Sequence, residues 1–279
     1  MLIDTHCHLD ASEFDADRST VAKLALQQAV KLIVIPAVIR SNFSAVQTLA
    51  QEYPYCAYAL GIHPLYVNQS QDADLLYLRN VIQGTASQDA LVTNNQFVAI
   101  GEIGLDFFVD AAIHGGGRER QEYFFSEQLK IAREFDLPVI LHVRKSVDDV
   151  LKHLRRIKVS GGIAHAFNGS FQQANEFIKL GFKLGFGGAM TYPRALKIRE
   201  LATILPLEAI VLETDSPDIA PEWLGHHGRN SPHELLRISE VLAHLRGLNS
   251  AQVADITTKN ALQVLPKLAQ LCTPPQVLL

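Results

Sequence analysis

Short apolar runs alternate with longer amphipathic segments along nearly the whole chain, and this alternation constrains the fold more than any other feature. Eight runs have the apolar, β-branched composition of strands: Met1–Thr5, Leu32–Val38, Ala57–Ile62, Val98–Ile103, Pro138–Val143, Gly162–Phe167, Phe182–Phe186 and Ile210–Thr214. Their C-terminal ends lie roughly 20 to 40 residues apart, which is the length of one strand–helix unit. Because strands that alternate with helices form parallel sheets, and eight such units favour closure, we expect a (β/α)8 TIM barrel.

The length of the chain agrees with this expectation. A chain of 279 residues fits either two domains of ordinary size or one barrel of about 250 residues. No linker, low-complexity tract or close repeat divides the sequence. We therefore expect a single domain over residues 1–279.

The segments between the expected strands carry helix signals. Asp17–Lys31 and Arg120–Phe135 place apolar residues at helical spacing on one face. Ser146 and Ser170 stand where each would cap the N-terminus of the next helix.

Two irregular segments interrupt the alternation. Phe107–Arg118 contains three consecutive glycines and follows the fourth expected strand, and Asp218–Ser231 follows the eighth. Both then lie on the C-terminal face of the barrel, where active sites of this fold are built. The alternative is that both are long surface loops without a function.

Several classes of protein are excluded by composition. No run approaches the roughly 20 apolar residues of a membrane span, and Asp4 stands where a signal peptide carries its basic region. Cys7, Cys56 and Cys272 are too few and too scattered for a disulfide framework, so we expect a reducing, cytoplasmic setting. The formal net charge of −4 argues against a broad basic surface that coats duplex nucleic acid, but not against a nucleic-acid substrate gripped locally. We infer no membrane contact and no obligate protein partner.

The first expected strand leads into a pair of histidines. Because successive strand residues alternate sides, His6 and His8 point the same way and Cys7 points the other way. Two imidazoles on a rigid strand can clamp a divalent metal ion. On its own, this spacing is equally compatible with ordinary hydrogen-bonded histidines, and we expect Cys7 to be a buried packing residue.

Further metal-competent side chains end the fourth, fifth, sixth and eighth expected strands: Glu102, His142, His165 and Asp215. Glu102 is costly to bury in an apolar strand unless it meets a cation, either a basic side chain or a metal ion. In a closed barrel these strand ends converge on one mouth. Four imidazoles and two carboxylates suit Zn²⁺, Mn²⁺ or a similar divalent ion. Six ligands exceed those of one catalytic zinc, so the pattern favours two ions that share a bridging carboxylate.

The motifs around these residues resemble the TatD family of metal-dependent deoxyribonucleases, within the amidohydrolase-like barrels. The matching motifs run from end to end of the chain: Asp4–Asp10, Gly61–Pro64, Gly101–Asp106, Leu137–His142, His165–Ser170 and Leu212–Pro217. The resemblance implies that His6, His8 and Asp215 hold one ion. It implies that His142 and His165 hold the second ion and that Glu102 bridges both. Zn²⁺ is the expected ion, with Mn²⁺, Mg²⁺ and Ni²⁺ as alternatives.

The chain departs from the family pattern at positions that concern the substrate. Asn168 stands where the family often has Ser, Leu65 stands where many members carry a further His, and the segment around residues 226–231 keeps only Arg229 and Asn230. Amidohydrolases of the dihydroorotase type bridge their metals with a carboxylated lysine. The equivalent strand here offers Glu102, which favours the phosphodiesterase-like interpretation.

The ligand set predicts a mechanism of hydrolysis. A metal-activated hydroxide would attack phosphorus, with Asp215 as proton acceptor and Glu102 as the bridging group. The expected phosphate-binding residues are His63, Arg144 and Arg229. Asp4 and Glu213 are candidates to orient the histidine ligands, with an ion pair or a structural hydrogen bond as the alternative. Tyr192 and Trp223 could stack on a base, but residues of this type are more often packing residues. Because few basic residues are committed, we expect exonucleolytic action on single-stranded or short DNA.

Two alternatives to a deoxyribonuclease stay open. The same site could hydrolyse another ester or amide bond, such as the ester of a D-aminoacyl-tRNA, because fold and metals do not fix the substrate. The other alternative is a non-catalytic metal-binding or scaffold protein, against which the retention of all six expected ligands argues.

Overall fold

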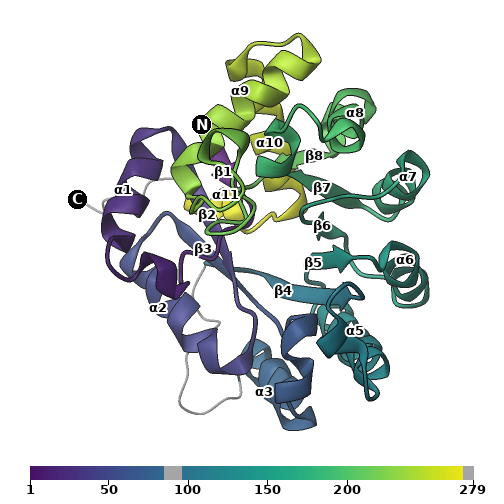
Figure 1. Ribbon diagram of the computed structural model, residues 1–279. Helices are drawn as coiled ribbons and strands as arrows, with labels where there is room; N and C mark the ends of the chain where they lie inside the picture. Colours follow the sequence, from purple (N-terminus) through teal and green to yellow (C-terminus); the bar gives the residue numbers. More distant parts are fainter. Residues whose placement is uncertain (85–95, 273–279) are drawn as a thin grey trace.

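The computed structural model describes residues 1–84 and 96–272, and its central feature is a parallel sheet rolled into a barrel (Figure 1). The strands follow one another in sequence order, each paired in parallel with the next. They are β1 (Leu2–Asp4), β2 (Val30–Pro36), β3 (Cys56–Leu60), β4 (Phe97–Asp106), β5 (Val139–Arg144), β6 (Gly162–Ala164), β7 (Phe182–Phe186) and β8 (Ile210–Leu212). The eight-stranded barrel expected from the sequence is confirmed, and the strand ends differ from expectation by a few residues.

Backbone contacts just beyond β1 and β8 close the barrel. The N–H of Asp215 donates to the carbonyl oxygen of His6, and the N–H of His8 donates to that of Ser216, both at 2.8 Å. Cys7 and Ser216 form an isolated parallel bridge between the same segments. The closure therefore lies at the level of the expected metal ligands, and it brings the two ends of the sheet together there.

Helices surround the barrel (Figure 1). They are α1 (Arg18–Gln27), α2 (Phe43–Glu52), α3 (Asp72–Gln83), α5 (Gly117–Glu134), α6 (Val147–Arg156), α7 (Phe171–Lys179), α8 (Leu196–Ile204) and α9 (Leu235–Arg246). The expected helix over residues 17–31 ends earlier than predicted, because β2 already begins at Val30. Within the described residues, none of these helices combines the length and the apolar character needed to cross a bilayer.

The two predicted capping serines behave differently. The hydroxyl of Ser170 accepts the N–H of Gln173 at 3.1 Å, which is a helix N-cap. Ser146 also precedes its helix, but its hydroxyl donates to the carbonyl oxygen of Leu105 at 2.6 Å instead. Ser146 thus ties the start of α6 to β4.

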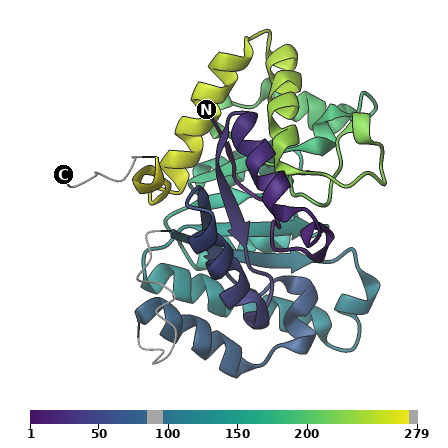
Figure 2. The same cartoon turned by 90° about the vertical axis from the view of Figure 1, so that its left-hand side faces the viewer.

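The interior of the barrel is filled by apolar side chains and is closed at the N-terminal end. One buried cluster combines alternate strand residues, among them Ile3, Ile140 and Ile163, with residues of α10 (Ser250–Val264) and α11 (Leu268–Leu271). The intervening strand residues pack against the surrounding helices in a second, larger cluster. In Figure 2, α10 and α11 lie on the side opposite the loops that follow the strands. The open end of the barrel is therefore the C-terminal end.

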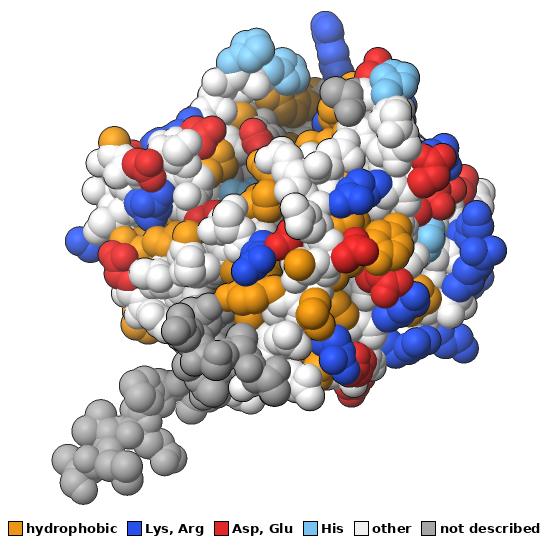
Figure 3. Space-filling view, turned by 90° about the horizontal axis from the view of Figure 1, so that it is seen from below, with side chains coloured by type: hydrophobic (Ala, Val, Ile, Leu, Met, Phe, Trp, Pro, Cys, Tyr) orange, Lys and Arg blue, Asp and Glu red, His pale blue; other side chains and the backbone are white. Residues whose placement is uncertain are grey.

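The two segments expected to be irregular contain short helical elements. Residues 107–118 include α4 (Asp110–Ile113), and α5 already begins at Gly117. Residues 218–231 include a 3-10 turn, η6 (Glu222–Leu224). On the face shown in Figure 3, Lys and Arg side chains are interspersed with Asp and Glu. That face offers no uniform positive surface to a nucleic-acid duplex.

The closed end of the barrel yields a stability prediction. Replacing the fully buried Leu265 by alanine should lower the free energy of unfolding by about 2–5 kcal/mol, because it leaves a cavity beneath the barrel interior. Urea unfolding followed by circular dichroism measures this change. Leu196→Ala is the matched control, because Leu196 is largely exposed and should change stability by less than about 0.5 kcal/mol. Equal effects of the two substitutions would show that α10 and α11 do not seal the barrel.

Candidate metal centre

Strand alternation places two of the expected histidines inside the barrel mouth. Ile140 of β5 and Ile163 of β6 belong to the interior cluster. His142 follows two residues later on β5, and His165 follows two residues later, just past the end of β6, so both face the same interior space at its C-terminal end. The paired register of β5 and β6 sets these rings side by side, with His142 Nδ1 and His165 Nε2 at 3.3 Å.

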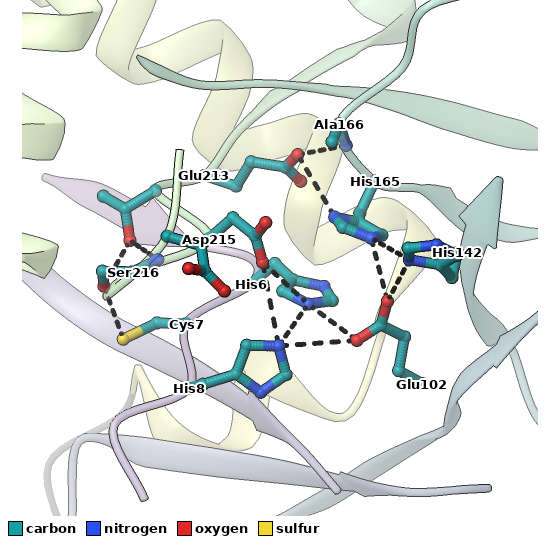
Figure 4. Close-up of polar contacts among 12 residues, drawn as sticks. His6, Cys7, His8, Glu102, His142, His165, Ala166, Glu213, Asp215 and Ser216 are labelled. Carbon is teal, nitrogen blue, oxygen red and sulfur yellow. Dashed lines mark hydrogen bonds and ion pairs between the residues drawn. The ribbon is translucent and has the colours of Figure 1, made fainter. Parts of the chain in front are cut away.

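A buried carboxylate stands at the centre of the site (Figure 4). One oxygen of Glu102, Oε2, lies 3.2 Å from His6 Nε2 and 3.5 Å from His8 Nε2. The other oxygen, Oε1, lies 2.9 Å from His165 Nε2 and 3.0 Å from His142 Nδ1. The two oxygens therefore divide the imidazoles into the same two groups that the family resemblance implies.

Asp215 joins the first of these groups. Its Oδ1 lies 3.4 Å from His6 Nε2 and 3.7 Å from His8 Nε2. His6, His165 and Asp215 also offer ligand atoms within 4.8 Å of one another, as do His6, His8 and Glu102. All six predicted ligands thus meet at the barrel mouth.

The donor atoms of this cluster fit divalent cations. His6 Nε2 faces His8 Nε2 at 3.3 Å, and the His142 and His165 rings meet as closely, although each such nitrogen pair has room for one proton at most. Glu102 is 2% exposed, so its carboxylate cannot be solvated by bulk water. Imidazole nitrogen and carboxylate oxygen are the ligands that Zn²⁺ and Mn²⁺ accept. Cys7 Sγ points away from the cluster, 3.1 Å from Ser216 Oγ, and is no ligand.

The cluster also perturbs its own titration. Burial alone would raise the pKa of Glu102, but the charge of the facing His165 ring and the hydrogen bond from His142 hold that pKa well below its usual range. Burial alone would lower the pKa of His165, but the charge of Glu102 raises it to about 10. Glu102 is therefore ionised, and its negative charge can interact with a bound cation.

Asp106 contacts one of the expected ligand histidines, although the sequence reasoning gave it no role. The carboxylate is fully buried, and its Oδ1 accepts the backbone N–H of Phe108 at 2.8 Å and that of Val109 at 3.2 Å. Its Oδ2 lies 3.0 Å from His142 Nε2. An N–H donated from Nε2 to this carboxylate leaves the lone pair of His142 on Nδ1, the nitrogen that faces Glu102 and His165. The available signal was a second carboxylate at the end of the same apolar strand as Glu102.

A glycine lets β4 bring Asp106 to His142. Gly104 pairs with His142 in the sheet and has a φ of +148°. A Cβ at this position would lie 2.0 Å from the carbonyl oxygen of His142. A side chain would push the two strands apart, and Asp106 with them.

His63 lies beside the cluster as a hydrogen-bond donor. It precedes the 3-10 helix η3 (Pro64–Gln69), and its Nδ1 accepts the N–H of Leu65 at 3.2 Å. The proton of the neutral ring is therefore on Nε2, which lies 3.4 Å from Glu102 Oε1. Burial lowers the pKa of His63 to about 4, so the ring stays neutral. An N–H in this position suits a substrate oxygen better than a metal ion.

The two residues expected to orient the histidines have different partners. Glu213 accepts the backbone N–H of Ala166, and its Oε1 lies 3.9 Å from His165 Nδ1. A Cβ at position 185 would lie 2.1 Å from Glu213 Oε2, so Gly185 leaves the room that this side chain needs. Asp4 instead accepts the hydroxyl of Thr214 at 2.6 Å and its N–H at 3.0 Å, which supports the closure between the β1 and β8 segments.

The structure places Arg229 differently from the expectation. Its guanidinium forms two hydrogen bonds to the Asp17 carboxylate, at 2.9 and 2.6 Å, and a third to the carbonyl oxygen of Glu13 at 2.7 Å. Arg229 is not among the residues that line the cavity over the cluster. This ion pair joins residues 212 positions apart, so no local pattern predicts it, and it fastens the 218–231 segment to the start of α1. In this structure the Arg229 guanidinium is therefore engaged by neighbouring residues, and its expected phosphate contact stays a prediction.

The two aromatic residues for which base stacking is the alternative to packing have partners within the protein. Trp223 donates its indole N–H to Glu234 at 2.7 Å, and the guanidinium of Arg237 lies over its ring. Tyr192 stacks on His226 with a centroid separation of 4.5 Å. Neither Trp223 nor Tyr192 lines the cavity.

A cavity of about 1310 Å³ opens above the cluster. Its floor includes His8, Glu102 and Asp215, and its walls include Arg144 and Lys145. Cavities of roughly 300–1,000 Å³ hold drug-sized ligands, so this one has room for more than a single small molecule.

The chain is similar over almost its whole length to proteins of one family. The family model described as TatD related DNase matches residues 3–266. The uncharacterized metal-dependent hydrolase YjjV of Escherichia coli K12 is 39% identical over 260 residues, which cover 92% of this chain and 95% of that protein. The crystal structure of YjjV, a TatD homolog, has a TM-score of 0.85 at 38% identity and covers 95% of this chain and 98% of its own. Human deoxyribonuclease TATDN3 is 30% identical over 273 residues, which cover 97% of this chain and 96% of that protein.

The contact between Asp106 and His142 leads to a prediction about metal affinity. In Asp106→Asn the amide oxygen should keep the two backbone N–H donors, so the NH₂ group would face His142 Nε2. The ring would then carry its proton on Nδ1, and the affinity for a divalent ion at that nitrogen should fall by about 10- to 100-fold. Competition with a chromogenic chelator measures the dissociation constant for each zinc equivalent.

The control is a carboxylate at the rim of the same cavity. Asp148 lines the cavity and accepts a hydrogen bond from Gln173, and no contact joins it to the histidines. Asp148→Asn should leave the affinity for the divalent ion unchanged. An equally unchanged affinity in Asp106→Asn would remove Asp106 from the metal centre.

Proposed function

The chain belongs to the family of TatD-related DNases, and from this premise we propose that it is a deoxyribonuclease that hydrolyses phosphodiester bonds at the ends of single-stranded or short DNA. Its relatives include proteins named metal-dependent hydrolases, and the clustered ligand groups support the use of a divalent metal here as well. Human TATDN3, named a deoxyribonuclease, supports DNA as the substrate.

Two ions are proposed, and Zn²⁺ is the expected species. His6, His8 and Asp215 would hold one ion, His142 and His165 would hold the other, and Glu102 would bridge them through its two oxygens. When bound, the ions would lower the pKa of a water molecule and offset the charge on the phosphoryl oxygens. The observation that carries the proposal is the division of the four imidazoles between the two oxygens of Glu102.

The residues of the chain then have distinct roles in hydrolysis. Asp215 Oδ1 faces the histidines, so Oδ2 would accept a proton from the attacking water. The water oxygen would bond to phosphorus as the bond to the leaving sugar oxygen breaks, and that oxygen would take up the proton that Asp215 accepted. His63 would donate its Nε2 proton in a hydrogen bond to a phosphoryl oxygen, and Arg144 at the cavity wall would pair with a phosphate.

The charges that line the cavity support single-stranded DNA ends as the substrate. The metal-ligand side chains lie at the barrel mouth, and the lining cations are few, with Arg144, Lys145 and Lys197 on the walls. Asp148 and Asp149 line the same cavity. This mixture of charges does not match a duplex with its dense row of phosphates, but it admits one flexible strand.

We also propose a reducing, cytoplasmic setting. Cys7 and Cys56 are buried free thiols, and Cys272 is an exposed free thiol. Free cysteines of this kind persist where thiols are kept reduced.

The proposed function is tested on a substrate panel. Purified protein loaded with zinc or manganese is assayed on a 3′-labelled oligonucleotide, on the same strand in a duplex, and on an aminoacyl-tRNA ester. We expect cleavage of the single strand, and a chelator should abolish it. Hydrolysis of the aminoacyl ester alone would replace the proposal with that ester hydrolase, and hydrolysis of no substrate would favour a non-catalytic metal-binding protein.

The ligand assignment predicts the behaviour of His142→Ala. This substitution should remove one of the two metal equivalents and lower the rate of oligonucleotide cleavage by at least about 100-fold. Plasma mass spectrometry gives the metal content, and a cleavage time course gives the rate. His244→Ala, an exposed histidine on α9, is the control and should keep both equivalents. Full activity of His142→Ala with unchanged metal content would refute the assignment.

A further inference from the structure

An exposed aromatic ring lines the cavity next to the metal centre. Phe108 follows β4, is 53% exposed and lies on the cavity wall. The guanidinium carbon of Arg144 lies 3.9 Å from the centre of its ring. Isolated exposed apolar residues are ordinary on protein surfaces, so the meaning of Phe108 depends on its surroundings.

Asp106 connects this ring to the metal centre. The backbone N–H of Phe108 donates to Asp106 Oδ1 at 2.8 Å, and Asp106 Oδ2 lies 3.0 Å from His142 Nε2. Arg144 Nη1 is 4.0 Å from the same carboxylate oxygen. One buried carboxylate therefore fixes the backbone at Phe108, lies beside the guanidinium, and orients the histidine of the metal centre.

Ring and guanidinium together have the chemistry of a nucleotide site. An aromatic face stacks on any nucleobase, and an arginine fork pairs with a phosphate. Because the Arg144 side chain is itself 51% exposed, its donors remain open to the cavity. With about half of its surface exposed, the Phe108 ring also has surface left for a base. Tyr192 and Trp223, the aromatic residues considered for this role, are engaged outside the cavity.

We propose that Phe108 and Arg144 form a subsite that binds one nucleobase of the substrate and an adjacent phosphate, on the His142 side of the metal centre. The proposal rests on the proposed function, because it specifies where a DNA strand lies at that same site. It assigns the base contact to stacking, so the subsite accepts any of the four bases.

The experiment combines two changes, the removal of the Phe108 ring from the protein and the removal of one base from the substrate, singly and together. Thymidine trinucleotides with one base at a time replaced by an abasic tetrahydrofuran are cleaved by the wild-type protein and by Phe108→Leu. Stacking predicts one position at which removing the base lowers kcat/KM of the wild type by about 5- to 100-fold, mainly through KM. In Phe108→Leu, removing the base at that position should cost little further.

A control separates stacking from support of the arginine. Phe171→Leu removes an exposed ring at the start of α7 that does not line the cavity, and it should behave as the wild type. If Phe108 only supported Arg144, Phe108→Leu would slow intact and abasic substrates equally. An equal cost of base removal in wild type and Phe108→Leu would overturn the subsite.

A binding measurement keeps the subsite separate from the proposed function. Calorimetry on the metal-loaded protein compares thymidine 5′-monophosphate with deoxyribose 5-phosphate. The subsite predicts several-fold tighter binding of the nucleotide, and Phe108→Leu should remove the difference. If no oligonucleotide is cleaved but this difference is seen, the deoxyribonuclease proposal fails and the subsite stands. Equal affinities of the wild type for the two ligands would contradict the subsite even in an active nuclease.

Discussion

The site depends on one buried carboxylate and the rings that surround it. Five imidazoles come within 3.5 Å of Glu102, which is itself almost inaccessible to solvent. A carboxylate in such a place is tolerated only when cations compensate the loss of its hydration. Four of the five rings present nitrogens in facing pairs with too few protons between them, which favours metal ions as the compensating charge. In the fifth ring, His63, Nδ1 accepts the N–H of Leu65. Its Nε2 therefore carries the proton and can donate a hydrogen bond to the substrate.

The barrel supplies the rigidity that this crowding requires. β1 and β8 lie more than 200 residues apart in the chain, and their extensions meet through Asp4, Thr214 and the backbone around His6. The barrel interior on the N-terminal side of the ligands is filled with aliphatic side chains and sealed by α10 and α11. This close packing limits the movement of the ligand side chains. Gly104 and Gly185 matter for the same reason, because Gly104 leaves space for the backbone of His142 and Gly185 for the side chain of Glu213 beside His165.

The sequence alone predicted what depends on local periodicity. The eight strands and the presence of ligands at their C-terminal ends follow from alternation and from the family motifs, and the structure brings all six side chains to one mouth. It could not show which charged and aromatic side chains are engaged by partners elsewhere in the chain. Arg229 meets Asp17 across 212 residues, and Trp223 and Tyr192 are engaged by neighbours that no spacing rule reveals. The sequence did not single out Asp106 and Phe108, because their contacts are with His142 and Arg144 on the neighbouring strand and exist only in the folded protein.

The central claim is that Glu102 bridges two cations, and diffraction tests it most directly. Crystals of the protein grown with excess zinc, measured on both sides of the zinc absorption edge, give an anomalous difference map that locates the ions without reference to a mechanism. We predict two peaks in each molecule, one among His6, His8 and Asp215 and one between His142 and His165, with Glu102 in contact with both. A map with no peak at the barrel mouth, or with a single ion that leaves one oxygen of Glu102 uncoordinated, would contradict the account.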